Sequence, residues 1–339
     1  MTSESFTTRD TNGNWRPADT IKLPPIVAWP PRPMLIAKFI FGFPGYLWPM
    51  NTIWFAITLL TWLFLTPELA AMKSLELWWV AAIYARNFAL VLALFGGLHL
   101  YFYVFQKQGD ERRFSDKPFA VNNPRFLFGD QVRDNVFRTL GTGVPIITGF
   151  EVLTYWLFAN GYLGFIPFEA NSVGFWVWFG VLLISAPVIH AIHFYFTHRL
   201  LHWRPLYKMV HRTHHLNVEI GPWSGIAMHP VEQAIYFSTV CVQWLLALHP
   251  VSALYQIQLA AFLPAMSHSG YERMLVNGKD TGWDSGSYFH YLHHKNFECN
   301  YGGAIAPLDQ MFGTFHDGSR QAQKAMRERM MTRRGVSAL

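Results

Sequence analysis

The chain has 339 residues, of which 51% are hydrophobic and 14% are charged, and its formal net charge is +6. Because soluble domains carry roughly 25% charged residues, this composition excludes an ordinary soluble domain and indicates a membrane protein. The sequence contains no basic run with interleaved aromatic residues, so we expect the positive charge to face anionic lipid rather than nucleic acid.

Four apolar stretches approach or exceed the length of about 20 residues that a helix needs to cross a bilayer. They cover residues 49–66, 88–105, 144–166 and 173–196. Before them, residues 33–48 contain a lysine and several Gly and Pro residues, which indicates an interfacial or re-entrant helix. The later segment 231–264 is apolar but contains Gln, His and Pro, so we expect a bent helical hairpin that dips into the bilayer.

Two charged residues, Arg86 and Glu151, fall within or beside the apolar stretches. A charge inside a membrane segment points to function by default. For Arg86 we favour the alternative, in which the long side chain snorkels to the membrane interface.

Basic residues are distributed unequally between the connecting loops. The loop at 106–143 contains seven Lys or Arg residues, whereas the loop at 66–77 has only Lys73 and the loop at 160–172 has none. Because cytoplasmic loops are enriched in basic residues, we expect both termini and the histidine-rich segments to be cytoplasmic. The membrane would be a bacterial inner membrane or, in a eukaryote, the endoplasmic reticulum.

Eight histidines are concentrated in three short segments that follow the fourth apolar stretch. The motifs are HxxxH at His198 and His202, HxxHH at His211, His214 and His215, and HxxHH at His290, His293 and His294. Positions i, i+3 and i+4 share one face of a helix, so we expect each motif to direct its imidazoles at one point. This pattern predicts a helical metal site, and a solvated polar helix face is the alternative.

The order of these motifs carries a resemblance, together with His229 in Ala-Met-His-Pro-Val-Glu, His268 in Ser-His-Ser-Gly-Tyr-Glu, and the stretch from Asn300 to Thr314. Over roughly residues 140–318 the chain resembles the fatty acid hydroxylase/sterol desaturase superfamily. The resemblance implies a membrane-bound, non-haem di-iron oxygenase that uses O₂ to hydroxylate or desaturate a lipid.

The resemblance also implies a set of metal ligands. Carried over position by position, they are His198, His202, His211, His214, His215, His268, His290, His293 and His294, with His229 as the tenth. His229 gains weight because Pro264, one turn before His268, cannot bind a metal. For His229 and His268 the alternative is an ordinary hydrogen-bonded histidine.

Nine or ten imidazoles are too many for one tetrahedral zinc, but two metal ions with about five protein and solvent ligands each would use them. We therefore predict a dinuclear site. The resemblance implies that its metals are two iron ions, which zinc can replace in purified samples. Because neutral ligands leave the cationic charge uncompensated, we expect hydrogen-bond acceptors behind the ligands. The candidates are Glu232, Glu272, Asn300 and Asp309, with a helix cap as the alternative for Asp309 and a turn for Asn300.

The predicted function is a lipid hydroxylase or desaturase with no catalytic residue beyond the metal centre. The alternatives are a zinc-dependent membrane hydrolase and a metal-stabilised membrane protein without turnover. A hydrolase would need a glutamate base, but the sequence has no HExxH motif and no Glu inside the histidine clusters.

Electrons must come from a partner, because no GxGxxG motif follows a predicted strand and no His-Pro-Gly-Gly haem signature occurs. We expect a ferredoxin or a b-type cytochrome with its reductase. The lipid, the carbon attacked and the choice between hydroxylation and desaturation stay open.

The substrate is expected to enter sideways from the cytoplasmic leaflet through a cavity lined by the aromatic residues of the 231–264 hairpin. The candidate contacts are Phe237, Trp244 and Tyr255.

The expected fold is an all-α integral membrane protein with about four transmembrane helices and a cytoplasmic, histidine-rich helical cap. We divide it into a polar N-terminal tail (1–33), an interfacial helix with two spans and a basic loop (34–143), a catalytic domain (144–318) and a basic C-terminal tail (319–339).

Overall fold

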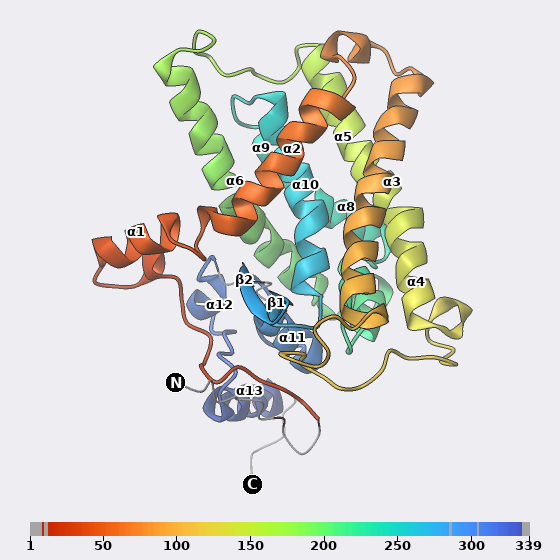
Figure 1. Cartoon of the computed structure of the whole chain (residues 1–339), viewed down its shortest axis with the longest axis vertical. Helices are drawn as coiled ribbons and strands as arrows, with labels where there is room; N and C mark the ends of the chain where they lie inside the picture. The colour runs from red at the N-terminus through yellow and green to blue at the C-terminus, as the bar shows by residue number, and fades with distance from the viewer. Residues whose placement is uncertain (1–8, 10–12, 285–286, 304, 334–339) are drawn as a thin grey trace.

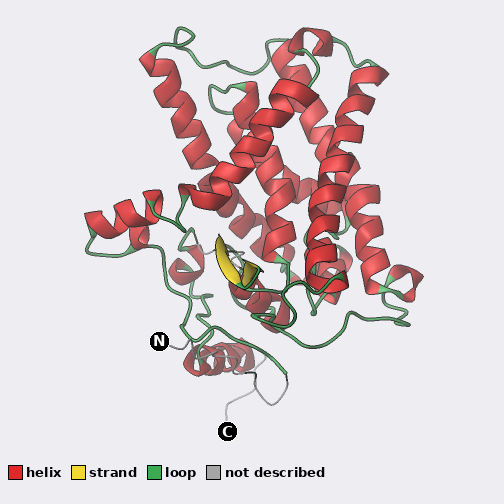
Figure 2. Ribbon diagram, in the orientation of Figure 1, coloured by secondary structure: helices red, strands yellow, loops and turns green. Residues whose placement is uncertain are grey.

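The computed structural model describes residue 9 and residues 13–284, 287–303 and 305–333. Long helices form a bundle at one end of the molecule, and shorter helices with a small sheet form a cap at the other end (Figures 1 and 2). Residues 13–32 and the last helix both lie at the cap end (Figure 1).

Four helical segments are long and apolar enough to cross a membrane, as the sequence predicted. They are Leu47–Leu65, Leu77–Val104, Gln131–Ala159 and Val173–Leu201. Their helices are α2 (Thr52–Leu65), α3 (Leu77–His99), α4 (Gln131–Arg138), α5 (Val144–Ala159) and α6 (Val173–Leu201), with π-helical turns at Leu47–Asn51, Leu100–Val104 and Thr139–Gly143. The second and third segments begin earlier than predicted, because polar residues at their beginnings are paired inside the protein.

The remaining helices lie outside these four segments. They are α1 (Pro33–Phe41), α7 (Arg204–Met209), α8 (Pro230–Phe237), α9 (Thr239–Gln243), α10 (Pro250–Ser267), α11 (Ser287–Asn296), α12 (Leu308–Met311) and α13 (Arg320–Arg333). Single 3₁₀ turns cover Pro25–Val27, Leu69–Lys73, Leu127–Gly129, His211–Leu216 and Pro222–Ser224.

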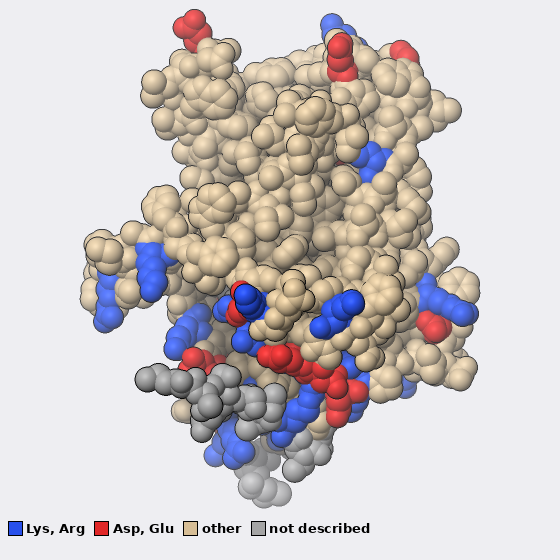
Figure 3. All heavy atoms as spheres, viewed as in Figure 1, with Lys and Arg blue, Asp and Glu red and all other residues tan. Residues whose placement is uncertain are grey.

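Charged side chains are concentrated at the cap end of the molecule. Figure 3 shows that few Lys, Arg, Asp or Glu side chains lie on the visible face of the helix bundle between its two ends. An uncharged band of this kind is the surface that hydrocarbon requires, because an exposed charge there is costly.

The segment 231–264 forms the bent helical hairpin that its sequence predicted. α8 and α9 form its first arm, and α10 returns through the middle of the bundle in contact with α2, α3, α5 and α6. Two of its glutamines are hydrogen-bonded within the hairpin: Gln243 donates to Gln256 at 2.8 Å, and Gln256 donates to Thr239 at 3.1 Å. Pairing within the protein is what allows polar side chains in a core this apolar.

The snorkelling expected of Arg86 is wrong. Its side chain is 4% exposed and forms an ion pair with Glu151, which is 0% exposed. Asn87 donates to the same carboxylate at 2.9 Å, and Arg86 also donates to the Thr66 hydroxyl at 3.0 Å. The pair joins α3 to α5 inside the bundle, and the charge stays buried because it is compensated there.

The expectation of a purely helical chain needs one correction, a two-stranded antiparallel sheet of β1 (Arg273–Val276) and β2 (Lys279–Asp284). Asn277 and Gly278 join the strands with positive φ values of 51° and 72°. Asn-Gly in a two-residue loop with this geometry is a strong hairpin signal, and it explains why the chain turns back here instead of forming a helix.

The two N-terminal elements differ in their surroundings. Trp15 is buried, and its backbone N–H donates to the Phe114 carbonyl at 2.8 Å, so residues 13–32 are fastened to the cap. α1 projects from the side of the molecule (Figure 1) and exposes Met34 and Phe41. An exposed apolar helix at this level fits the predicted interfacial helix.

The buried ion pair gives a stability prediction. Glu151→Leu should lower the free energy of unfolding by about 3–5 kcal/mol, because it leaves the Arg86 charge buried without a partner. The double variant Arg86→Leu/Glu151→Leu should recover a large part of that loss, because both charges are then gone. Equilibrium unfolding of the purified protein in detergent measures both, and a double variant no more stable than Glu151→Leu would contradict this account.

Candidate metal centre

Nine histidine side chains converge in the cap and form two separate groups. Group A contains His198, His202, His211, His215 and His293, and group B contains His214, His268, His290 and His294. Within each group, one ligand nitrogen from every residue lies within 4.8 Å of all the others. All nine side chains are buried except that of His202, which is partly exposed.

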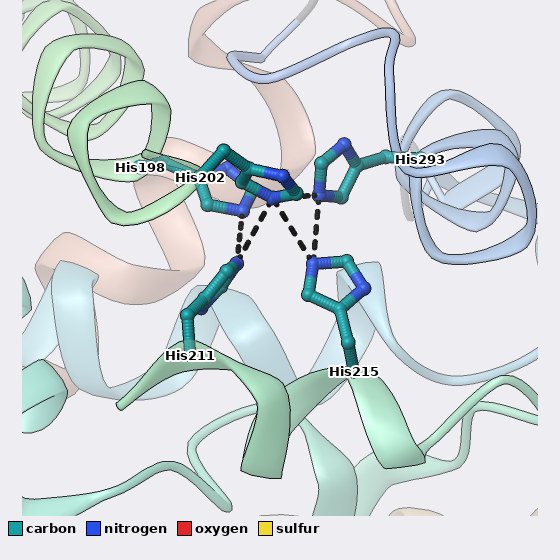
Figure 4. Close-up of side chains that lie close together, drawn as sticks. All are labelled: His198, His202, His211, His215 and His293. Carbon is teal, nitrogen blue, oxygen red and sulfur yellow. Dashed lines mark hydrogen bonds between the residues drawn. The ribbon is translucent and has the colours of Figure 1, made fainter. Parts of the chain in front are cut away.

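The nitrogens of group A lie at the spacing that a metal ion requires. The Nε2 atoms of His198 and His211 are 3.1 Å apart, as are those of His202 and His293 (Figure 4). Ligands at about 2.1 Å from a metal ion and at right angles to each other lie about 3.0 Å apart. Group A therefore has the donor atoms and spacing of a metal site.

Group B has the same spacing with four members. The Nε2 atoms of His290 and His268 are 3.0 Å apart, those of His294 and His290 are 3.1 Å apart, and those of His268 and His214 are 3.3 Å apart. The lone histidine of the sequence, His268, thus lies within this group.

Each HxxHH motif is divided between the two groups, which corrects the expectation that it would direct all three imidazoles at one point. His290 and His294 on α11 belong to group B, and His293 belongs to group A. In the 3₁₀ turn His211–Leu216 the first and last histidines of the motif belong to group A, and His214 belongs to group B. On α11 the helical period explains the division, because i+4 lies about 40° from i whereas i+3 lies about 60° away on the other side. A regular 3₁₀ turn would instead place i and i+3 on one face, so the period does not explain the division at His211–Leu216.

α6 carries group A to the end of the helix bundle. The helix begins at Ser172, whose hydroxyl accepts a hydrogen bond from the Phe175 N–H at 3.2 Å. It continues without a break beyond the apolar stretch, so His198 and His202 lie one turn apart at its last turn. The site is therefore attached directly to a candidate membrane span.

Several imidazoles are oriented through their second nitrogen. The Nδ1 atoms of His198 and His293 donate to the carbonyls of Tyr301 and Cys299, each at 2.7 Å. The Nδ1 atom of His268 donates to the Pro264 carbonyl at 3.1 Å. Because a carbonyl can only accept, Nδ1 carries the proton and the Nε2 lone pair faces the group.

Burial keeps the imidazoles in the form that binds metal. Loss of solvation lowers the pKa of His215 and His294 well below the ordinary value, and it lowers the pKa of His268 to about 3. Neutral imidazole is the form that binds a metal ion, so burial favours the protonation state that a metal site requires. Burial also raises the pKa of the Glu232 carboxyl.

The four residues predicted as hydrogen-bond acceptors behind the ligands lie at different distances from the histidines. The carboxyl of Glu232 lies 2.6 Å from Nδ1 of His211. The Asp309 carboxylate accepts from the backbone N–H groups of Tyr301 and Gly302 at 2.9 and 2.8 Å, and so fixes the carbonyl that orients His198. Their metal-tuning role stays a prediction.

Asn300 and Glu272 are farther from the ligands. The Asn300 amide donates to the Phe289 carbonyl at 3.1 Å, just before His290, and its backbone takes a positive φ of 54°. It therefore shapes a turn beside α11. Glu272 adjoins the small sheet and is hydrogen-bonded through its backbone to Arg112; none of the nine histidines has it as a hydrogen-bond partner.

The structure does not bring His229 into either group. Its Nδ1 accepts from the Val231 N–H at 3.2 Å and caps α8. Glu232, in the first turn of α8, contacts His211 of group A. The segment therefore supports group A through the Glu232 carboxyl and not through His229. Other histidines are also engaged elsewhere: His190 contacts the Tyr236 hydroxyl at 3.3 Å and His193 the Ser238 hydroxyl at 3.1 Å.

A cavity of about 560 Å³ leads from the histidines to the turn between α1 and α2. Members of both groups border it, and most of the lining is apolar. The lining includes Pro187, Ala191, Phe194, Met228, Tyr236 and Leu259. At the end near α1 the Tyr46 hydroxyl donates to the Ile184 carbonyl at 2.5 Å, which links this turn to α6.

The predicted substrate contacts Phe237, Trp244 and Tyr255 do not line this cavity. Phe237 is buried in the main core, and Trp244 donates to the Thr154 hydroxyl at 3.2 Å. The Tyr255 ring packs edge-on against Phe55. The hairpin borders the cavity through its other face, which the aromatic content alone did not reveal.

One signal in the sequence could have identified the lining. Pro187, Ala191 and Phe194 precede His198 on α6 at spacings of three and four residues, so all four share one helix face. A stripe that ends in a predicted ligand marks the surface that leads to group A.

The two groups give a prediction for metal binding. His293→Ala should remove a ligand from group A, and His294→Ala should remove a ligand from group B, so each variant should lose about one of two bound metal ions. Elemental analysis of the purified variants beside wild type measures this.

His99→Ala is the matched control, because His99 lies at the end of α3 and stacks on Tyr103, away from both groups. It should retain the wild-type metal content. Full metal content in both cluster variants would contradict the assignment of the groups.

The chain resembles known lipid-modifying proteins. Delta(7)-sterol 5(6)-desaturase ERG3B of Gibberella zeae is 26% identical over 214 residues, which cover 57% of this chain and 58% of that protein. Methylsterol monooxygenase 1 of Gallus gallus is 29% identical over 150 residues, which cover 44% and 51%. Delta(7)-sterol 5(6)-desaturase ERG3 of Saccharomyces cerevisiae is 25% identical over 287 residues, which cover 81% and 68%.

The chain spans little more than half the length of the first two of these relatives. No solved structure matches it. Residues 181–314 match the family described as fatty acid hydroxylase, and this range includes all nine converging histidines. These matches support the resemblance to the fatty acid hydroxylase/sterol desaturase superfamily that the histidine motifs indicate.

Proposed function

We propose that this chain is a membrane-bound iron oxygenase that uses O₂ to hydroxylate or desaturate a lipid, either sterol-like or fatty acyl. One observation carries the proposal: two groups of buried imidazoles lie at the inner end of an apolar cavity. The names of two relatives, a sterol desaturase and a methylsterol monooxygenase, support a lipid as the substrate.

The number of imidazoles supports two metal ions. Group A has five ligand nitrogens, one more than a tetrahedral zinc ion takes, and group B has four. Imidazole ligands suit iron as well as zinc, so zinc in a purified sample is compatible with iron in the cell. Iron, when bound, would supply the activation of O₂ and the removal of hydrogen from an unactivated C–H bond.

The chain's own residues would position the substrate and exclude water. Phe194 stacks on the imidazole of His198 with ring centroids 4.7 Å apart, so an apolar wall adjoins group A. A lipid chain or ring in the cavity would replace water there, and each buried methylene contributes about 0.8 kcal/mol. Dry surroundings also protect a reactive oxidant from side reactions.

Orientation and electron supply complete the proposal. The cap carries most of the visible charge (Figure 3), and the basic loop 106–143 adjoins it, so we place the cap in the cytoplasm. The electrons would come from an external donor, a ferredoxin or a b-type cytochrome with its reductase. The substrate would enter sideways from the cytoplasmic leaflet, past α1.

The alternative of a zinc hydrolase lacks a general base. The Glu232 carboxyl contacts Nδ1 of His211. This nitrogen lies on the side of the ring opposite Nε2, which faces group A. A base for hydrolysis would have to face the opening where water and substrate meet.

The function is tested by comparing the lipids of cells that express the wild-type chain or a ligand variant. His214→Ala and His293→Ala should abolish formation of the oxidised lipid and leave the protein in the membrane, because each removes one ligand. His99→Ala should retain most of the activity. Cluster variants that oxidise lipid at the wild-type rate would contradict the proposal.

The cavity is tested by filling it. Ala191→Phe adds a ring to a buried position of the lining and fills space that the substrate needs, so turnover should fall by about tenfold or more, which corresponds to about 1.4 kcal/mol or more in the activation barrier. Ile192→Phe is the control, because Ile192 is 41% exposed on the outer side of α6. Equal turnover of the two variants, with metal content unchanged, would show that the substrate binds elsewhere.

A further inference from the structure

A second cavity, of about 500 Å³, lies in the cap between residues 14–16, α11 and α13. Its charge is one-sided: the described lining residues include five cations and no Asp or Glu. The cations are Arg16, Lys295, Arg320, Lys324 and Arg327. We call this cavity the basic cleft.

The basic cleft and the histidine groups use opposite sides of the same helix. α11 presents His290, His293 and His294 to the two groups, and it presents Tyr291 and Lys295 to the cleft. Helix α11, about 10 Å across, therefore separates the cleft from the ligand nitrogens. Leu292 lines the cleft and is bonded to His293, so a short covalent path also connects the two.

The floor of the cleft is fixed in place. The Lys295 ammonium donates to the Asn14 side-chain carbonyl at 2.9 Å and lies 5.4 Å from the centre of the Tyr291 ring. The Tyr291 hydroxyl donates to the same Asn14 oxygen at 3.2 Å. On α13, Lys324 and Arg327 are exposed and lie three residues apart, so they share one side of the helix.

We propose that the basic cleft is the docking surface for an acidic one-electron carrier protein. The inference rests on the proposed function, which requires electrons from outside the chain. Each reduced carrier would lose one electron and one metal ion would gain it, so two encounters reduce the pair and no atom is transferred. Complementary charge accelerates and orients such encounters.

The position of the cleft favours a soluble protein over lipid headgroups. α13 lies at the extreme cap end, whereas the exposed apolar helix α1 lies closer to the long helices (Figure 1). If α1 marks the membrane surface, the cleft faces away from it, and attraction to headgroups falls off within a Debye length of about 8 Å.

The test uses the full chain in nanodiscs of zwitterionic lipid, with a [2Fe–2S] ferredoxin and the soluble haem domain of a b-type cytochrome as probes. Calorimetry gives the affinity of each probe at low and at physiological ionic strength. The charge-reversal variant is Lys324→Glu/Arg327→Glu. The matched control is Arg125→Glu/Arg133→Glu, which makes the same charge change at two exposed positions near α4.

We expect at least one carrier to bind the wild-type chain, with an affinity that falls as salt rises. Lys324→Glu/Arg327→Glu should weaken that binding about tenfold or more, and the control should leave it near the wild-type value. Mixed anaerobically with oxidised iron-loaded protein, the same reduced carrier should be reoxidised more slowly by the charge-reversal variant. Methyl viologen, a small reductant, should reduce the metal of all variants equally.

Equal affinity in the two double variants, or binding of neither carrier to wild type, would overturn the docking surface while leaving the proposed function standing. A charge reversal that changes only attachment to anionic vesicles would do the same, because it would assign the cleft to lipid. If a carrier binds but methyl viologen cannot reduce the metal, the proposed function fails, and the assignment to an electron carrier fails with it.

Discussion

The structure depends on one constraint: nine imidazoles are held with neighbouring nitrogens about 3.1 Å apart in a buried space. Burying so many nitrogen lone pairs without a partner costs folding free energy, and a cation bound between them would offset that cost. Other parts of the cap serve the same end. The carbonyls of Tyr301 and Cys299 fix the histidine tautomers, and the Asp309 carboxylate fixes the backbone that carries one of those carbonyls.

The helix bundle solves a related problem in apolar surroundings. Arg86 is compensated by Glu151, and Gln243 by Gln256, so polar groups tie the helices together without facing lipid. α6 connects this bundle to the cap, because one continuous helix carries both the lining of the cavity and the first two histidines of group A. Under the proposed function, the same helix would align a substrate in the cavity with the histidines.

Much of the candidate site could be predicted from the sequence, because its main elements are local. The four apolar segments and the three histidine motifs are set by periodicity within about 20 residues. The same periodicity predicts the division of the HxxHH motif on α11, but not that of the motif in the 3₁₀ turn His211–Leu216. Contacts between distant segments were not: Arg86 and Glu151 are 65 positions apart, and no local pattern pairs them. His229 was expected beside the metal, but the fold uses it to cap α8 and brings Glu232 to the site instead.

The central claim is that groups A and B each hold one iron ion. The most direct measurement is the iron content of wild-type protein that is produced with iron and purified without oxygen, combined with X-ray absorption at the iron edge. The account predicts about two iron ions per chain, with imidazole nitrogen as the dominant ligand at about 2.1 Å. One iron ion or none per chain in fully loaded protein, or a ligand shell dominated by oxygen, would contradict it.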